Sequence, residues 1–231
     1  LLVIAVIGVV GFVPLERRAG RHALIPPAII ANRDFAASCV AILCMSATFF
    51  AALLYLPQFM ETQLGFSPLE SGLGMVPALA TFALVSFVAG PLYSRVGAKR
   101  LATFGAACMC TAGILFSLVG ADASYGALVP GMIVLGLGIG SFYATATTAG
   151  VTSVDESQAS LAGGIVYMFQ IAGGSIGLGL TTTVFSANVP PFIDGFQAGF
   201  RLDAGIALVG FVISLLFVGG ALVRRRATAP A

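Results

Sequence analysis

One stretch decides the class of fold: residues 204–223, with the sequence AGIALVGFVISLLFVGGALV. Every position is apolar or small, so a helix over this stretch would be apolar on all its sides. A strand of a membrane barrel would instead alternate apolar and polar residues over about ten positions. Because a helix needs about 20 apolar residues to cross about 30 Å of hydrocarbon, residues 204–223 predict a transmembrane helix.

The composition of the whole chain points to the same environment. Of its 231 residues, 58% belong to the set AVILMFWYC and only 9% are charged, whereas an ordinary soluble domain has about 25% charged residues. The mean hydropathy is +1.04. These values exclude a soluble fold, and we expect the chain to have a lipid bilayer around it and no nucleic-acid partner.

Six other apolar stretches, all low in charge, precede residues 204–223 in the chain. They are residues 1–13, 35–57, 71–93, 101–120, 126–150 and 161–186. The sequence therefore predicts an all-α integral membrane protein with seven transmembrane helices. Leu1 lies inside an apolar run with no basic region before it, unlike the start of a signal peptide. We therefore expect the first span to be truncated and the chain to begin inside a longer protein.

The basic residues predict the orientation of these helices. Ten of the eleven Lys and Arg residues lie in the odd-numbered connections or in the C-terminal tail, and Arg201 is the exception. Short cytoplasmic loops carry an excess of Lys and Arg. We therefore expect the C-terminus to be cytoplasmic, in a bacterial inner membrane, and residues 58–70, 121–125 and 187–203 to face outward.

Carboxylates inside the hydrocarbon usually mark ion or proton sites, because a charge there costs about 2.5–3.5 kcal/mol even on a permissive scale. The predicted spans have none near their centres. The acidic residues of the outer side lie at predicted span ends or in loops: Glu61, Glu70, Asp122, Asp194 and Asp203. We therefore expect proton-coupling acids to belong mainly to another part of the longer protein.

Small residues concentrate in the fifth and sixth predicted spans. Gly136 and Gly140 form one pair spaced by four residues, and Gly173 and Gly177 form another. Such pairs let two helix backbones approach closely in lipid. The pattern predicts helix packing, although faces of this kind also allow helices to slide or rock during transport, and the sequence does not separate the two roles.

Polar and aromatic side chains within the predicted spans are the candidates for lining a substrate cavity. Gln170 is the most informative of them, because an amide in hydrocarbon requires partners and tends to face a bundle interior or a wet cavity. Tyr167 lies three residues earlier and shares its helix face. Phe50, which can also serve packing alone, Tyr55 and Tyr143 complete the set of candidates.

Neither a metal site nor a cofactor is predicted. The four cysteines, Cys39, Cys44, Cys108 and Cys110, fall within apolar stretches, where a thiol packs as a small hydrophobic group. The only histidine, His22, lies in a basic loop.

A membrane-embedded enzyme would need clustered nucleophiles or ligands, so an enzyme is the less favoured class. A seven-helix receptor or sensor would also fit the helix count and the orientation. However, the predicted spans contain no Lys that could bind a retinal-type cofactor.

A short basic connection between the third and fourth spans carries a family signature. Residues 90–101 have the sequence GPLYSRVGAKRL, with Gly90, Arg95, Gly97, Lys99 and Arg100 at its defining positions. The segment resembles the G-x-L-x-[DS]-R-x-G-x-[KR]-[KR] loop of the major facilitator superfamily, in the copy between its eighth and ninth core helices. From its residues we expect this connection to be a tight loop of about seven residues, with Gly90 at the helix end and Gly97 in the turn.

Three more stretches narrow the resemblance. They are FVPLERR at 12–18, YLPQ at 55–58 leading through GFSPLESG at 65–72, and ASLAG at 159–163 leading to GGSIG at 173–177. They are similar to the C-terminal half of fourteen-span drug:proton antiporters of the EmrB/QacA type. The resemblance implies two parts: the end of a linker span with a basic cytoplasmic loop at 1–34, and a C-terminal six-helix bundle at 35–231.

The resemblance also implies a function, with two departures from the family pattern. It implies export of lipophilic, often cationic, small molecules by alternating access, coupled to protons, with the N-terminal half of the same transporter as the missing partner. Ser94 stands where the fuller signature has Asp, which puts a locking role of the loop in doubt. Gln170 stands where many relatives have Arg, which removes a fixed positive charge from the cavity wall and favours cations held by aromatic faces.

Overall fold

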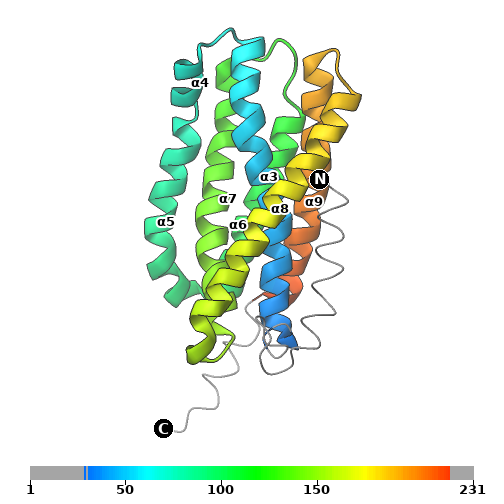
Figure 1. Ribbon diagram of the computed structural model, residues 1–231. Coiled ribbons are helices and arrows are strands. Elements are labelled where there is room, and N and C mark those ends of the chain that lie inside the picture. The colour runs from blue at the N-terminus through cyan, green and yellow to red at the C-terminus, as the bar shows by residue number, and fades with distance from the viewer. Residues whose placement is uncertain (1–28, 30, 219–231) are drawn as a thin grey trace.

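The computed structural model describes Ile29 and residues 31–218, which form an all-helical bundle (Figure 1). In this part of the chain there is no strand. The helices are α3 (Arg33–Gln63), α4 (Pro68–Gly74), α5 (Val76–Val96), α6 (Ala98–Ser117), α7 (Tyr125–Thr152), the 3-10 turn η2 (Glu156–Gln158), α8 (Ala159–Ala187) and α9 (Phe192–Phe217).

Within the described residues, six helical segments are long and apolar enough to cross a membrane, with α4 and α5 counted as one segment. They confirm six of the seven predicted spans and establish a multi-pass membrane protein. The first predicted span, residues 1–13, and nearly all of the predicted 1–34 segment lie outside the described residues.

The boundary predicted for the last span is wrong. We expected it to begin at residue 204, after an outward loop, but α9 begins at Phe192. Polar residues lower the average hydropathy of this region, yet the buried positions of α9 continue through it at helical spacing. These buried positions are Ile193, Phe196, Phe200, Asp203, Ala207, Gly210 and Ser214, and one continuous face of this kind favours one continuous helix.

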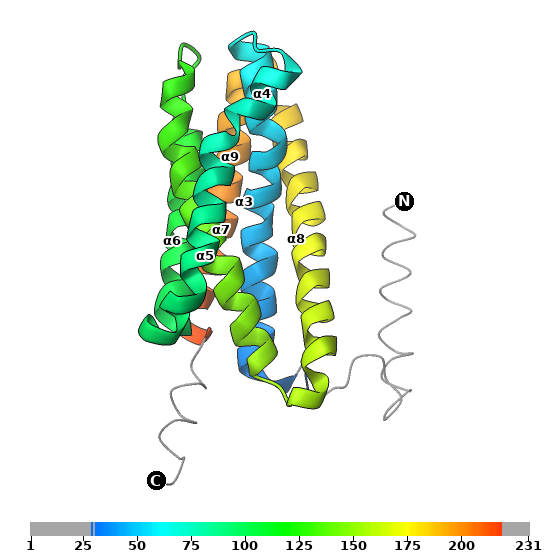
Figure 2. The ribbon, with the colours of Figure 1, turned by 90° about the vertical axis from the view of Figure 1, so that its left-hand side faces the viewer.

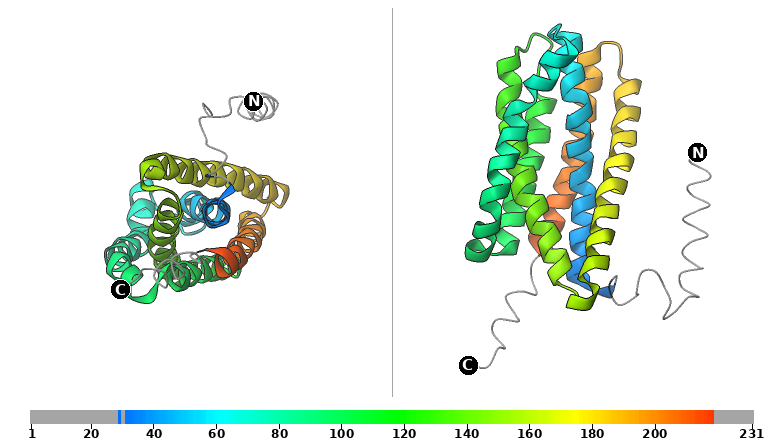
Figure 3. Two further views of the ribbon diagram at one scale, coloured as in Figure 1. Left: turned by 90° about the horizontal axis from the view of Figure 1, so that it is seen from below. Right: turned by 60° about the vertical axis from the view of Figure 1, so that its left-hand side comes forward.

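Helix α3 occupies the centre of the bundle, with α8, α9, α6 and α5 around it and α7 between α3 and α5 (Figure 3). Two ends of the bundle can be distinguished. At the α4 end α3 and α8 stop and α9 begins, and at the Gly97 end α5 is joined to α6 (Figure 1). Asn32 fixes the start of α3, because its side chain accepts from the Phe35 N–H and donates to the Ser153 carbonyl at 2.6 Å.

The predicted seven-residue loop between the third and fourth spans is shorter in the structure. Helix α5 continues to Val96 and α6 starts at Ala98, so the chain reverses at Gly97 alone. Gly97 has a φ of 88°, a conformation that glycine adopts readily and other residues avoid. The expectation that Gly90 stands at the helix end is wrong, because Gly90 lies inside α5.

The paired glycines lie at the closest helix contacts. A Cβ atom at Gly136 would lie 2.5 Å from the Ala78 carbonyl oxygen, so α7 meets the backbone of α5 there. Gly140 lies one turn further along the same contact, against Val85. On α8, Gly173 and Gly177 lie against Leu43 and Ala47 of the central helix. These small residues allow the close backbone approach that membrane helices use in place of a hydrophobic drive.

Candidate functional site

Three helices form the candidate site on one face of the bundle. Helices α7 and α8 meet near the η2 turn, where Gly150 faces Val166 and Ser38. Toward the α4 end they diverge, and α3 stands between them (Figure 2, and Figure 3, right). At this level Phe49 and Phe50 of α3, Tyr143 of α7 and Gln170 of α8 are only partly buried. We call this surface the α7/α8 opening.

Aromatic side chains of α3 and α7 form the wall of the α7/α8 opening. The rings of Phe49 and Phe50 meet edge to face, with centroids 5.5 Å apart, and the centroid of Phe49 lies 6.0 Å from that of Tyr143. The Tyr143 hydroxyl forms a 2.9 Å hydrogen bond with Ser46. Phe50 also lies against Gly174 of α8, where a Cβ atom would be 2.6 Å from the ring. The structure thus brings together Phe50 and Tyr143, two of the predicted cavity residues.

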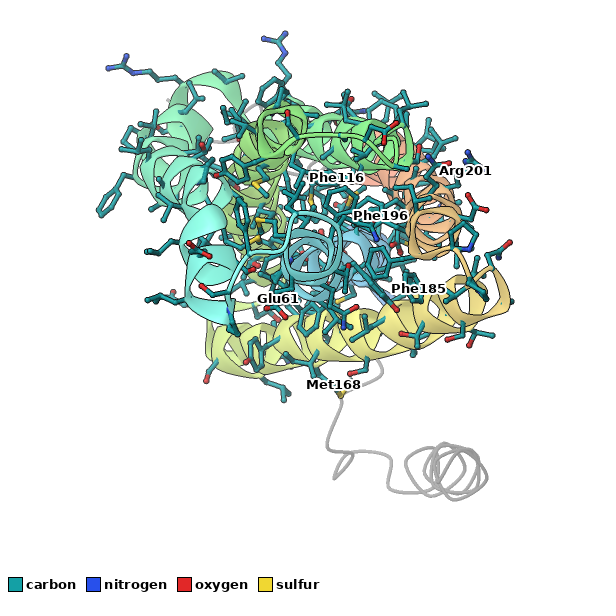
Figure 4. All side chains as sticks on the ribbon, turned by 90° about the horizontal axis from the view of Figure 1, so that it is seen from above. Glu61, Phe116, Met168, Phe185, Phe196 and Arg201 are labelled. Atoms are coloured by element: carbon teal, nitrogen blue, oxygen red, sulfur yellow. The ribbon has the colours of Figure 1, made fainter. Side chains whose placement is uncertain are left out.

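Gln170 lies on the face of α8 that packs against the bundle. Val166, one turn before it, and Gly174, one turn after it, are both buried, yet Gln170 itself is only partly buried. The bundle therefore leaves the amide partly uncovered where α7 and α8 diverge. Tyr167 lies at the edge of the same face and is 62% exposed, whereas Met168 points away from the bundle (Figure 4).

Tyr55 lies apart from the other four cavity candidates. Its side chain is 3% exposed, and its hydroxyl donates to Thr182 of α8 at 2.9 Å. Its ring lies 4.8 Å from that of Phe185. A substrate would reach Tyr55 only if α3 and α8 moved apart.

Asp203 is a buried acid that our sequence interpretation placed at the outer end of a span. In the structure it is fully buried, twelfth in a helix of 26 residues. Thr48, at the midpoint of α3, donates to its backbone carbonyl at 3.2 Å. The signal that could have found it is its register, because Phe196, Phe200 and Ala207 place Asp203 on the buried face of a helix.

The five residues of the family loop signature lie at the Gly97 end. Arg95, Lys99 and Arg100 are exposed in the adjoining turns of α5 and α6. Ser94, which replaces the expected Asp, donates its hydroxyl to the Pro91 carbonyl of its own helix at 2.8 Å. The basic residues therefore gather beside the turn, and Gly97 provides its conformation.

These features define the class of protein: a membrane-embedded helical bundle with an uncharged, aromatic opening on one face. The family profile of the Major Facilitator Superfamily matches residues 1–178 and 38–230, so the chain belongs to this superfamily. This family assignment favours the transporter class over an enzyme.

Similar curated proteins are named for transport or resistance. The chain is 26% identical over 206 residues to the multidrug transporter protein MdtP of Bacillus subtilis (strain 168), covering 86% of this chain and 38% of that protein. It is 28% identical over 217 residues to the lincomycin resistance protein of Streptomyces lincolnensis, covering 93% and 44%. It is 26% identical over 228 residues to the puromycin resistance protein pur8 of Streptomyces alboniger, covering 96% of this chain and 45% of that protein. The chain thus spans less than half the length of these relatives.

Proposed function

We propose that this chain is the C-terminal half of a fourteen-span drug exporter, and that the whole transporter moves lipophilic or cationic small molecules by alternating access in exchange for protons. The names of the relatives support a drug substrate. The short coverage of those relatives supports a missing N-terminal half as the partner. Alternating access requires two bundles that rock about a site at the midplane, and this chain provides one.

The observation that carries the proposal is the α7/α8 opening. Its side chains are aromatic or carry an uncharged amide, and they come from three helices. They are Phe50 of α3, Tyr143 of α7, and Tyr167 and Gln170 of α8. Aromatic faces attract cations although the faces carry no fixed negative charge. An amide that is partly open to solvent can exchange a bound water for substrate. Such a surface suits lipophilic cations of varied shape.

The distribution of charge supports a cytoplasmic location for the Gly97 end, in a bacterial inner membrane. Arg33, Arg95, Lys99 and Arg100 lie at this end, together with the acids Asp155 and Glu156 of the η2 turn. At the α4 end the exposed charged residues include the acids Glu61, Glu70, Asp122 and Asp194. Arg201, on α9, is the basic residue that departs from this separation. From the positive-inside rule we infer that the Gly97 end and the C-terminus are cytoplasmic.

The test uses the whole transporter in liposomes with an imposed pH gradient and a fluorescent lipophilic cation such as ethidium. We expect gradient-driven dye movement above that of protein-free liposomes. Gln170→Ala and Tyr167→Ala should change the order in which the transporter prefers several dyes. For a dye that loses a hydrogen bond, the apparent binding free energy should weaken by about 0.5–1.5 kcal/mol.

Met168→Ala is the matched control, because Met168 is 50% exposed on the same helix and points away from the bundle. We expect it to leave the dye preference unchanged. If the wild-type transporter moves no dye under any gradient, the proposed exporter is refuted. If all three variants keep the wild-type rank order at equal protein levels, the α7/α8 opening is not the substrate site.

A further inference from the structure

Asp203 is held in a polar contact between α8 and α9 that the α7/α8 opening does not include. Its Oδ1 lies 2.8 Å from Thr181 Oγ1. Its Oδ2 is buried without a hydrogen-bond partner among the described residues. Both side chains are almost completely buried, Asp203 at 0% and Thr181 at 1% exposure. A carboxyl group with one unpaired oxygen inside a packed bundle requires an explanation.

A layer of four phenylalanines separates Asp203 from the α4 end. The centroid of Phe196 lies 5.0 Å from that of Phe59 and 4.7 Å from that of Phe200, and Phe200 lies 5.1 Å from Phe116. All four rings are buried, and Figure 4 shows Phe116 and Phe196 inside the bundle. Water therefore has no open route to Asp203 from this end.

Toward the Gly97 end, small groups continue the close packing. A Cβ atom at Gly210, two turns beyond Asp203, would lie 2.8 Å from Met45 Cε and 2.9 Å from Cys44 Cβ. Ala207, between them, is 0% exposed. The carboxyl group is thus enclosed from both directions along the bundle.

The helices around Asp203 bring no cation to it. From α3 the nearby titratable side chains are Tyr55, which donates to Thr182, and Cys44 beside Gly210. From α6 the thiol of Cys110 lies 3.8 Å from the Ala204 carbonyl. In α8 the only ionisable side chain is Tyr167, which is exposed.

The basic residues of these elements lie elsewhere. Arg33, Lys99 and Arg100 stand in the first turns of α3 and α6, at the Gly97 end. On α9 itself, Arg201 is exposed, donates to Gln197 and points away from the bundle (Figure 4), and Asp194 is exposed in the first turn. A buried carboxylate without a paired cation is strongly disfavoured.

The hydroxyl of Thr181 distinguishes the two protonation states of the carboxyl group. It lies 2.9 Å from the Gly177 carbonyl and 2.8 Å from Asp203 Oδ1, but it has only one proton to donate. If Oδ1 carries a proton, Asp203 donates to Thr181, and Thr181 donates to Gly177. If Asp203 is charged, Thr181 must turn its proton to Oδ1 and no longer donates to Gly177, so one of the two hydrogen bonds is lost. Oδ2 has no partner among the described residues in either state. The neutral acid therefore satisfies more groups in this packing.

We propose that Asp203 is a proton-binding site within the bundle, occupied in this closed arrangement and emptied when α8 moves away from α9. On emptying, the proton passes from Oδ1 to water that enters between the helices, and the Thr181 hydroxyl rotates to donate to the carboxylate that remains. The site would couple protons to helix movement in the exporter proposed above, and only that coupling role rests on the proposed function.

The first measurement is infrared spectroscopy of the whole transporter in lipid at neutral pH. We expect a carbonyl band of a protonated, unhydrated carboxyl group that disappears in Asp203→Asn. Asp194→Asn is the matched control, because Asp194 lies exposed on the same helix, and it should keep the band. Asparagine imitates the neutral acid in size and can donate to Thr181, so Asp203→Asn should fold normally.

The second measurement is dye transport by the same variants. Asp203→Asn should lose accumulation driven by a pH gradient and keep dye exchange without a gradient, whereas Asp194→Asn should keep both. The absence of a band specific to Asp203 would overturn the proton site, whatever the transport result. Full gradient-driven accumulation in Asp203→Asn would overturn its coupling role. A wild-type protein that moves no dye contradicts the exporter alone, because the infrared band still decides the proton site.

Discussion

The contact between α3 and α8 leads to a prediction that depends on single methyl groups. A Cβ atom at Gly177 would lie 2.5 Å from Ala47 Cα, and one at Gly173 would lie 2.6 Å from Leu43 Cα. Ordinary contact begins at 3.4 Å, so each methyl group is about 0.8–0.9 Å too close. The obstructing atoms are backbone atoms of Leu43 and Ala47 and, at Gly177, also the Cβ of Ala47, and none of them can rotate away. Gly173→Ala and Gly177→Ala must therefore push α8 away from α3.

The cost follows from the size of this displacement. A gap of about 0.5–1 Å forfeits a quarter to a half of the dispersion attraction at each contact along the interface, and overpacked sites typically lose about 1–3 kcal/mol. We expect a loss of this size for each variant. Gly164→Ala and Gly179→Ala are the matched controls on the same helix, because a Cβ atom there meets nothing within 4 Å. Both should be neutral or slightly stabilised, since alanine favours a helix by about 1 kcal/mol over glycine.

The assay is thermal unfolding of the whole transporter in detergent, with all four variants purified at equal concentration. Membrane abundance serves as an independent readout. The reasoning is refuted if Gly177→Ala unfolds at the same temperature as Gly179→Ala, because the two helices would then have room that the structure does not give them.

Two further changes test local features of the fold. Gly97→Ala should destabilise the bundle by about 1–3 kcal/mol, because the backbone of Gly97 (φ 88°, ψ 154°) lies in a region that residues with a Cβ rarely adopt. Gly90→Ala inside α5 should change the unfolding temperature little, and equal effects of the two would contradict a special role for Gly97. Asn32→Ala should cost about 0.5–2 kcal/mol through the lost cap and speed hydrogen exchange in the first turn of α3. Unchanged exchange at Asp34 and Phe35 would contradict this role of the cap.

The sequence predicted the spans well where one apolar segment lay between charged or turn-forming residues. The segments 126–150 and 161–186 differ from α7 and α8 by only one or two residues at each end. The predicted start of the last span was wrong because it followed the average hydropathy, whereas the helical spacing of the buried residues marks the true start of α9. Residues 192–203 contain Asp194, Gln197, Arg201 and Asp203, which lower the average without interrupting the buried face.

The candidate site was predictable only in part. Gln170 drew attention through its chemistry, since an amide within a span needs a partner or a cavity. Its position between α7 and α8 follows from the divergence of those helices, which no local pattern encodes. Tyr55 has the same kind of side chain as Tyr143, yet the first is enclosed and the second lies beside the α7/α8 opening.

The sequence by itself determined the membrane environment, the helical class and the family, because these depend on composition, on the length of apolar segments and on local motifs. The tertiary structure decided which side chains are enclosed. Asp203 and Asp194 are the same residue type on one helix, nine positions apart in sequence, but Asp203 is buried against α3 and α8 whereas Asp194 is exposed. The environment of a side chain depends on the elements that pack against it, and those elements come from distant parts of the chain.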